Sequence, residues 1–321
     1  MSHTEKLKVG LAQIAPIWLD REKTTEKVCQ FINMAADQQC GLVAFGETLL
    51  PGYPFWLSST HGSKFDCDVQ KDIHAHYLQS AINVPRGDLK SICNVARERN
   101  IAVMVGGFEL GSNRGGHTGY CTLFFIDALG QIKNAHRKLV PTYEERLAWG
   151  NGDGNGLNTF PVGAFTVGGL NCWENWLPLP RATLHAQGEN LHIAVWPGSK
   201  KITIDITRFV ALESRSYVVS VSGLMRTSDI PDEFPHRNLI VKAYDSEMIA
   251  DGGSCVANPD GSWLIEPVCD QEKLLVATLD HTEVLRARQN LDISGHYSRP
   301  DVFQISVNRD RQQILDQGMD G

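Results

Sequence analysis

The chain has 321 residues, of which 42% are hydrophobic and 21% are charged, a balance typical of a globular protein with a sizeable core. Its formal net charge of −7 argues against the basic surface that nonspecific nucleic-acid binding requires. No apolar run approaches the roughly 18 residues of a membrane-spanning helix, and the N-terminal segment is polar where a secretory signal would be apolar, so we expect a cytoplasmic protein that binds neither nucleic acid nor membrane.

Short apolar runs alternate with amphipathic stretches along the chain. In the first half, strands are predicted at 9–14, 42–45, 101–108 and 122–126, and helices at 21–38 and around 89–96. In the second half, strands are predicted at 165–170, 191–196, 217–221, 255–257 and 274–279, and helices before Gly188, at 206–214 and at 283–289. This alternation predicts an α/β protein with helices packed on the faces of sheets. It does not distinguish a Rossmann-like sheet from a layered sandwich.

No shift in composition divides the chain. It lacks charge blocks, low-complexity linkers and short repeats, so we predict a single domain over 1–305 and a short C-terminal tail over 306–321. Two segments are predicted to be elaborated loops: 51–77, which is rich in aromatic, Ser and His residues, and 225–253, which has prolines and scattered charge. Long loops on a rigid scaffold often shape access to a site.

The cysteines form no recognisable framework. No C-x-x-C pair occurs, which argues against zinc-ribbon and thioredoxin-like motifs, and a chain of this length does not need disulfide stapling. We expect free thiols, most of them with a structural role in the core. The eight are Cys29, Cys40, Cys67, Cys93, Cys121, Cys172, Cys255 and Cys269.

Glu47 directly follows the buried strand predicted at 42–45. At the end of a strand, a side chain can project into a pocket while its backbone stays fixed. Partial burial there would raise the pKa of a carboxyl group toward the range of a general base. Taken alone, Glu47 is interpreted equally well as a surface acid in a turn.

Lys138 is followed by a stretch of sequence that contains a tryptophan and is rich in glycine. A lone Lys is usually a solvated surface charge, but Trp149 and the glycine-rich stretch at 150–154 predict a loop that folds tightly against the body of the protein. An ammonium group near a carboxylate and a thiol would stabilise an anionic tetrahedral species and favour the thiolate.

Cys172 ends an apolar strand, and a helix is expected to begin soon after Pro178. A thiol at such a turn lies near free backbone N–H groups, which lower its pKa and can serve as an oxyanion hole. A buried structural cysteine is the common alternative, but the polar neighbours Asn171 and Glu174 argue against it. The order Glu, Lys, Cys, each at a strand exit, is a stronger signal than any one residue.

Over nearly its whole length the sequence resembles the nitrilase superfamily, the carbon–nitrogen hydrolases. The segments around Glu47, Lys138 and Cys172 match that family's three catalytic motifs in order and spacing. Trp173 after the cysteine is typical of the nitrilase branch, whereas amidases more often carry Tyr or another residue there. Gly46 departs from the pattern, in which Pro is common, and we expect this to alter the local turn and not the chemistry. Further matches to nitrilases are Glu174-Asn175, Pro178-Leu179, Arg137-Lys138-Leu139, Pro141-Thr142, Glu145-Arg146, Trp149-Gly150, Gly152-Asp153-Gly154 and the stretch 295–301.

The resemblance implies a four-layer α-β-β-α sandwich, commonly paired into a homodimer, which nitrilases often extend into larger homo-oligomers or spirals. It implies that Cys172 is the nucleophile, Glu47 the general base and Lys138 the charge stabiliser. Glu145 resembles the family's second glutamate, which supports the lysine and positions substrate or water; the alternative is a surface acid beside Glu144. The expected activity is hydrolysis of a nitrile to the carboxylic acid and ammonia through a thioimidate and a thioester on the cysteine.

Four aromatic residues are candidates for the walls of a substrate pocket, although aromatic side chains more often belong to a core. They are Tyr53, Trp149, Trp173 and Trp196. We expect no cofactor and no metal, because His74, His76 and Asp72 lack the further ligands that a metal site needs.

Other functions stay open at this point. An amidase with the same triad would hydrolyse an amide through a tetrahedral adduct, and a nitrile-hydrating or cyanide-degrading variant would partition the intermediate differently. A non-catalytic binding or scaffold member would be indicated by loss of a triad residue, and none is lost. Whether the nitrile is aliphatic, aromatic or an arylacetonitrile depends on the shape of 51–77 and 225–253.

Overall fold

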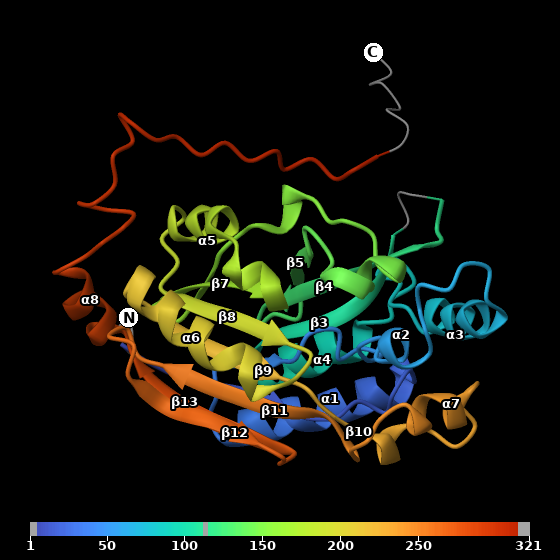
Figure 1. Ribbon diagram of the computed structural model, residues 1–321. Helices are drawn as coiled ribbons and strands as arrows, with labels where there is room; N and C mark the ends of the chain where they lie inside the picture. The colour runs from blue at the N-terminus through green and yellow to red at the C-terminus, as the bar shows by residue number, and fades with distance from the viewer. Residues whose placement is uncertain (1–4, 112–114, 314–321) are drawn as a thin grey trace.

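A computed structural model describes residues 5–111 and 115–313 of the chain (Figure 1). Its strands form two sheets. In spatial order, the first contains β13 (Lys273–Asp280), β1 (Lys6–Gln13), β2 (Leu42–Phe45), β3 (Ala102–Gly111), β4 (Thr118–Ile126) and β5 (Ile132–Arg137). The second contains β10 (Leu224–Arg226), β11 (Met248–Ala257), β9 (Tyr217–Ser222), β8 (Leu191–Trp196), β7 (Phe165–Asn171) and β6 (Phe160–Val162), with β12 (Trp263–Cys269) beside β11. The strands β1–β3 and β7–β9 run parallel within their sheets.

Helices cover the outer faces of both sheets (Figure 1). The helices α1 (Arg21–Asp37) and α4 (Lys90–Arg99) pack on the first sheet, and α5 (Pro178–His185) and α6 (Lys200–Ser214) pack on the second. Between the sheets, one buried apolar cluster takes residues from both, among them Val9 and Leu42 from the first and Ile193 and Val219 from the second. The layers therefore follow the order α-β-β-α, which confirms the fold that the resemblance implied.

The remaining elements are short and lie around this sandwich. They are α2 (Trp56–Ser59), α3 (Asp68–Gln79), α7 (Arg237–Lys242), α8 (His281–Arg288) and the 3₁₀ turns η1 (Tyr143–Leu147), η2 (Gly154–Gly156), η3 (Cys172–Trp176) and η4 (Thr227–Asp229). No helix of the described residues is both long enough and apolar enough to cross a membrane. All eight cysteines are free, as predicted.

Both predicted loops contain regular structure, so those two predictions were wrong. Residues 51–77 include α2 and most of α3, and residues 225–253 include η4, α7 and the start of β11. In α3, Ile73 and Tyr77 are four residues apart and buried, which orients this helix on the body, but the polar residues around them, among them Asp72 and His74, obscure the pattern. The predictions also missed β5, β6 and β12, because these strands are short or half-exposed and carry few consecutive apolar residues.

The division into a domain over 1–305 and a tail over 306–321 stays a prediction. Beyond α8 the chain runs in an extended form along the α5 side of the molecule (Figure 1). Val307 packs beside the buried cluster of Leu157, Leu170 and Leu184, and the Arg311 guanidinium donates to Asp153 at 2.9 Å. Residues 314–321 of the predicted tail lie outside the described residues.

Candidate active site

Three candidate residues follow the ends of strands, each within two residues. Glu47 follows β2, Lys138 follows β5 and Cys172 follows β7. The exits of the two sheets are joined here, since the Glu47 N–H donates to the Trp196 carbonyl at the end of β8 at 3.1 Å. The three side chains are almost completely enclosed, with 2%, 1% and 3% of their surfaces exposed. Their position at strand exits is therefore as predicted, and the fold brings all three together.

The β2 exit passes so close to neighbouring backbone that two glycines are required. A Cβ on Gly46 would lie 2.9 Å from the backbone nitrogen of Gly223, and a Cβ on Gly106 would lie 2.4 Å from the Gly46 carbonyl oxygen. A side chain at either position would push the Glu47 segment away from the second sheet. The departure at Gly46 thus serves the local backbone and leaves the carboxylate in place.

The Lys138 ammonium lies between two carboxylates. Its Nζ donates to Glu47 Oε1 at 2.9 Å and to Glu145 Oε2 at 2.7 Å, and all three side chains are buried. Burial alone would lower the pKa of Lys138, but the adjacent carboxylates hold it well above its ordinary value. The lysine therefore stays charged and supplies a fixed cation inside the site. Glu145 joins this group, and it is not the surface acid that the sequence left as an alternative.

The two oxygens of the Glu47 carboxyl group differ in their surroundings. Oε1 accepts hydrogen bonds from Lys138 Nζ and, at 3.5 Å, from the Cys121 thiol. Oε2 has no hydrogen-bond partner among the described residues. Burial raises the pKa of Glu47 to about 7, against the opposing effect of Lys138, in the direction predicted from the sequence. A carboxyl group with this pKa and a free oxygen is suited to take a proton near neutral pH.

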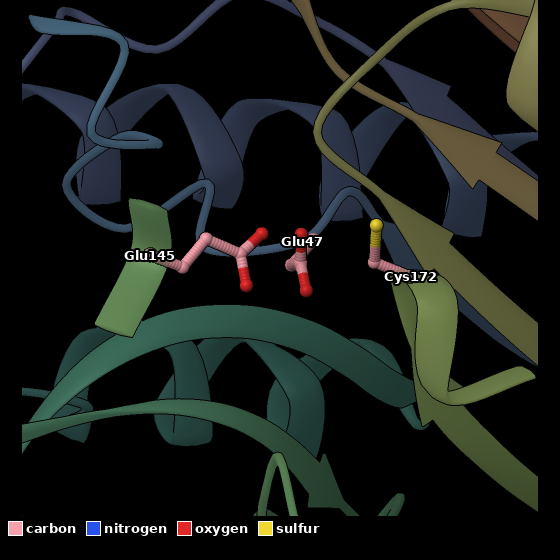
Figure 2. Close-up of side chains that lie close together, drawn as sticks. All are labelled: Glu47, Glu145 and Cys172. Carbon is pink, nitrogen blue, oxygen red and sulfur yellow. The ribbon is translucent and has the colours of Figure 1, made fainter. Parts of the chain in front are cut away.

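Cys172 begins η3 in a left-handed backbone conformation, with φ of 48°. Its sulfur and the nearest carboxylate oxygens of Glu47 and Glu145 all lie within 4.8 Å of one another. Figure 2 shows these side chains, with Glu47 between the other two. Such a conformation is uncommon for a residue with a side chain and marks a constrained position.

The pKa of Cys172 differs from the sequence-based prediction of a lowered value. Burial and the negative charge of Glu47 hold the pKa of this thiol well above its ordinary range, although Lys138 and a hydrogen bond from the Trp173 N–H act in the opposite direction. The prediction considered the backbone N–H groups, which lower the pKa of the thiol, but not the loss of solvent around the sulfur, which raises it. The resting cysteine is therefore a thiol that needs a base to become a nucleophile.

Glu174 ties two of the strand exits together. Its Oε1 accepts from the Leu139 N–H at 2.9 Å, and its Oε2 accepts from the Asn171 N–H at 3.1 Å and contacts His136 Nε2 at 2.9 Å. Burial would raise the pKa of Glu174, but His136 and these backbone donors hold it below its ordinary value. The neighbours of Lys138 and Cys172 are thus fixed to one buried carboxylate. The sequence indicated Glu174 as polar context and as part of a nitrilase motif, but not as the link between these strand exits.

A second buried network lies behind the candidate nucleophile. Asn175 Nδ2 donates to the Cys172 carbonyl at 2.8 Å, and its Oδ1 bonds His192 Nε2 at 2.7 Å. The other ring nitrogen of His192 bonds Glu189 Oε1 at 2.8 Å. The sequence indicated Asn175 only as a match to the nitrilase motif and gave no sign of His192, because nothing in the chain order shows that these two residues meet beneath the turn.

The four candidate pocket aromatics lie in different surroundings. The Tyr53 hydroxyl donates to Glu145 Oε1 at 2.8 Å, and Lys138 Nζ lies 5.5 Å from the ring centroid of Trp149. Trp173 is half-exposed beside the nucleophile, whereas Trp196 is fully buried in the apolar cluster that contains Cys172. Tyr53 and Trp149 therefore border the charged group directly, and the role of all four as pocket walls stays a prediction.

The carboxylates and the thiol also form a grouping with the spacing of metal ligands. A cation is already present among them, since the Lys138 ammonium bonds both carboxylates. The sequence-based rejection of a site at 72–76 stays a prediction; there, Asp72 Oδ2 bonds His236 Nε2 at 2.9 Å.

Comparison with known proteins adds independent information. The family model described as carbon-nitrogen hydrolase matches residues 8–289. A protein named nitrilase 2 from an unknown prokaryotic organism is 34% identical over 310 residues, which cover 96% of this chain and 95% of the relative. An aliphatic nitrilase from Rhodococcus rhodochrous is 31% identical over 96% of this chain and 84% of its own length.

Solved structures share the fold at low sequence identity. A carbon-nitrogen hydrolase from Helicobacter pylori superposes with a TM-score of 0.69 at 17% identity, over 92% of this chain and 96% of its own. An amidase from Nesterenkonia superposes with a TM-score of 0.62 at 16% identity, over 91% of this chain and 96% of its own. The match of the family model over most of the chain, together with these relatives, shows that the protein belongs to the carbon-nitrogen hydrolase family and is a hydrolase of carbon–nitrogen bonds.

Proposed function

We propose that the protein is a nitrilase that converts a nitrile and two water molecules into a carboxylic acid and ammonia, with Cys172 as the nucleophile. The observation that carries this proposal is the buried group itself. A thiol, a carboxyl group with a pKa of about 7 and a lysine ammonium converge where three strands end. The relatives that carry the name nitrilase, at 34% and 31% identity, favour a nitrile as the substrate.

The first half of the proposed reaction forms a covalent thioimidate. Oε2 of Glu47 takes the proton from the Cys172 thiol, and the resulting thiolate adds to the nitrile carbon. The nitrile nitrogen takes up that proton as the carbon–sulfur bond forms. Lys138 and the Trp173 N–H stabilise the negative charge of this step, since both act to lower the pKa of the Cys172 thiol.

The second half releases both products. Glu47 deprotonates a water molecule, which adds to the thioimidate carbon and gives a tetrahedral intermediate. The nitrogen takes the proton that Glu47 had accepted and becomes an amino group. Glu47 then removes the proton of the new hydroxyl group and passes it to this nitrogen, so that the carbon–oxygen double bond forms, the carbon–nitrogen bond breaks, ammonia leaves and a thioester remains. A second water molecule hydrolyses the thioester to the carboxylic acid and restores the thiol.

Glu145 is proposed to hold Lys138 and to orient substrate or water. Its carboxylate accepts from Lys138 Nζ at 2.7 Å and from the Tyr53 hydroxyl at 2.8 Å. These bonds fix the ammonium in a position facing both Glu47 and the thiol. Tyr53, Trp149, Trp173 and Trp196 are proposed as walls of the substrate pocket.

An amidase with the same residues is the second candidate. The Glu47, Lys138 and Cys172 group also suits attack on an amide, for which one water molecule completes the reaction from the thioester. The fold is shared with an amidase from Nesterenkonia, and fold alone does not separate the two activities. Trp173 after the nucleophile and the named relatives favour the nitrilase.

We also propose that the protein acts in the cytoplasm as a homodimer or a larger homo-oligomer. The outer surface of η3, α5 and α6 supports self-association, because its aromatic and aliphatic side chains are exposed next to one another. This apolar face consists of Trp173, Trp176, Leu177, Leu179, Phe209 and Leu212. The ring of Trp176 lies 6.4 Å from the rings of both Trp173 and Phe209, so these three aromatic side chains lie together on the surface.

Ammonia release from aliphatic, aromatic and arylacetonitrile substrates and their matching amides tests the proposed activity, with Cys172→Ala as the control. We expect release from nitriles and a loss of at least about 10³-fold in the variant, because the covalent step requires the thiol. The variant should keep the thermal unfolding temperature of the native protein within a few degrees. Release from amides alone would assign the protein to the amidases, and release that survives in a folded variant would exclude Cys172 as nucleophile.

A further inference from the structure

A second thiol lies beside the candidate base and has no part in the proposed reaction. Cys121 is on β4, between β3 and the edge strand β5 of the first sheet, and 1% of its surface is exposed. Its sulfur lies 3.5 Å from Glu47 Oε1 and 3.3 Å from the Thr48 hydroxyl. Its backbone carbonyl also accepts the Lys138 N–H at 2.8 Å. One residue of β4 thus contacts both the candidate base and the candidate cation.

The Cys121 thiol accepts one of these two hydrogen bonds and donates the other. The Thr48 hydroxyl donates to the Cys121 sulfur, so the thiol hydrogen is left for the other neighbour, the Glu47 oxygen. Thr48 is fully buried and holds a left-handed backbone conformation with φ of 49°, which keeps its hydroxyl at this position. The chain of donors runs from Thr48 through Cys121 to Glu47.

We propose that Cys121 is a positioning residue for the general base: its thiol and the Lys138 ammonium both hold Oε1 of Glu47, and this leaves Oε2 as the oxygen that exchanges protons with Cys172. This inference rests on the proposed role of Glu47 in the reaction. A terminal carboxyl torsion is soft, and one donor alone leaves the group free to turn. Two donors on the same oxygen restrict that rotation and direct the free oxygen to the reacting atoms.

Cys121 differs from Cys172 in its place in the fold, although both thiols are buried and have raised pKa values. It lies within a sheet ladder, paired with Phe108 on β3, whereas Cys172 begins a 3₁₀ turn and receives the Trp173 N–H. Burial and the charge of Glu47 raise the pKa of the Cys121 thiol well above its ordinary value, so the group keeps its proton and acts as a donor. A hydrogen bond from this neutral donor stabilises the carboxylate form of Glu47 and opposes the rise of its pKa on burial.

The pH dependence of two reactions tests this assignment. One is kcat/KM for ammonia release, and the other is alkylation of Cys172 by iodoacetamide without substrate, followed by peptide mass spectrometry. In the native protein we expect both rates to fall as the pH drops below about 7, because Glu47 becomes protonated there. In Cys121→Ala the Glu47 carboxylate loses a hydrogen-bond donor, so its pKa should rise further. The pH at which both rates begin to fall should then increase by about 0.5 unit, so that each rate is about 3-fold lower on the acidic side of its profile.

Three further variants separate positioning from a general structural effect. Cys121→Ser keeps a donor at the same place and should retain the native profile. Cys255→Ala removes another buried thiol, which bonds Thr207 at 3.6 Å on the second sheet, and should leave both profiles unchanged. Thr48→Val removes the hydroxyl that orients the thiol and should shift the profiles in the same direction as Cys121→Ala, so the test survives if the alanine variant does not fold.

The outcomes distinguish this inference from the proposed function. The positioning role would be overturned if Cys121→Ala and Thr48→Val both kept the native pH profiles. It would also be overturned if the profiles of Cys121→Ser shifted as far as those of Cys121→Ala. A shifted alkylation profile in a protein that releases no ammonia from any nitrile or amide would support the role of Cys121 and overturn the nitrilase proposal. Alkylation of Cys121 ahead of Cys172 would also overturn the assignment.

Discussion

The charges of the candidate site are arranged around a neutral thiol. Burial holds the pKa of Cys172 well above its ordinary range and raises that of Glu47 to about 7. A thiolate that existed before substrate binding would place three anionic groups around the single Lys138 ammonium. Proton transfer to Glu47 at the moment of attack avoids that accumulation of charge, because one negative charge moves from the carboxylate to the sulfur.

Glu145 offers a direct test of how the ammonium is held. Glu145→Gln should lower kcat by about 10²-fold or more, because an uncharged amide cannot replace the carboxylate that Lys138, Tyr53 and the Thr142 N–H all donate to. Steady-state kinetics on the best substrate gives the value. The matched control is Glu144→Gln, a partly exposed neighbour, for which kcat should stay within about 2-fold. Equal effects of the two substitutions would contradict the role of Glu145.

At the scale of elements, three strand exits have to keep one relative position. The exits of β5 and β7 are linked by Glu174, which accepts from backbone N–H groups on both and bonds His136. The exits of β2 and β8 are linked by the hydrogen bond from the Glu47 N–H to the Trp196 carbonyl. The site therefore depends on connections between strands as much as on the strands that carry its residues.

Removal of this link should destabilise the fold. Glu174→Ala leaves His136 and two backbone donors without their acceptor, so we expect a loss of about 3 kcal/mol in the free energy of unfolding at pH 7. The pKa of Glu174 is held below its usual 4.5, so this stabilisation is present above that pH and decreases as the pH falls through the lower folded value. Urea unfolding at neutral and acidic pH measures both effects.

Glu98→Ala, on the exposed side of α4, is the control for that measurement. Its side chain faces solvent, and the free energy of unfolding should change by less than about 0.5 kcal/mol. If Glu174→Ala were as stable as this control, the desolvation penalty of the buried carboxylate would be as large as the stabilisation from its hydrogen bonds.

For the whole molecule, the apolar face of η3, α5 and α6 predicts self-association. Light scattering coupled to size exclusion should give at least twice the chain mass of 35.6 kDa, and Leu179→Glu should shift the protein toward monomer, because a charge in an apolar interface is costly. Leu129→Glu is the control, since Leu129 is exposed to a similar extent, 65% against 69%, in the turn between β4 and β5. A monomeric native protein would contradict the prediction.

The sequence by itself determined the α/β class, most of the core strands and the three residues on which the proposed chemistry depends. These features are local: an apolar run predicts a strand, and a polar residue directly after it predicts a side chain at that strand's end. The prediction of loops at 51–77 and 225–253 was wrong because the helices in these segments are held by contacts with distant residues. Tyr77, for example, stacks on Phe108. Local pattern alone does not contain that packing.

Only the tertiary structure decided which groups surround those three residues. Cys121 lies 74 positions from Glu47 in the chain and 3.5 Å from it in space, and Asn175 meets His192 across 17 positions. The pKa of Cys172 was predicted in the wrong direction because desolvation depends on all the atoms that exclude water, and no single motif encodes them. The order of residues in the chain indicates which groups are proposed to react, whereas burial and contacts across the two sheets determine the charge of those groups.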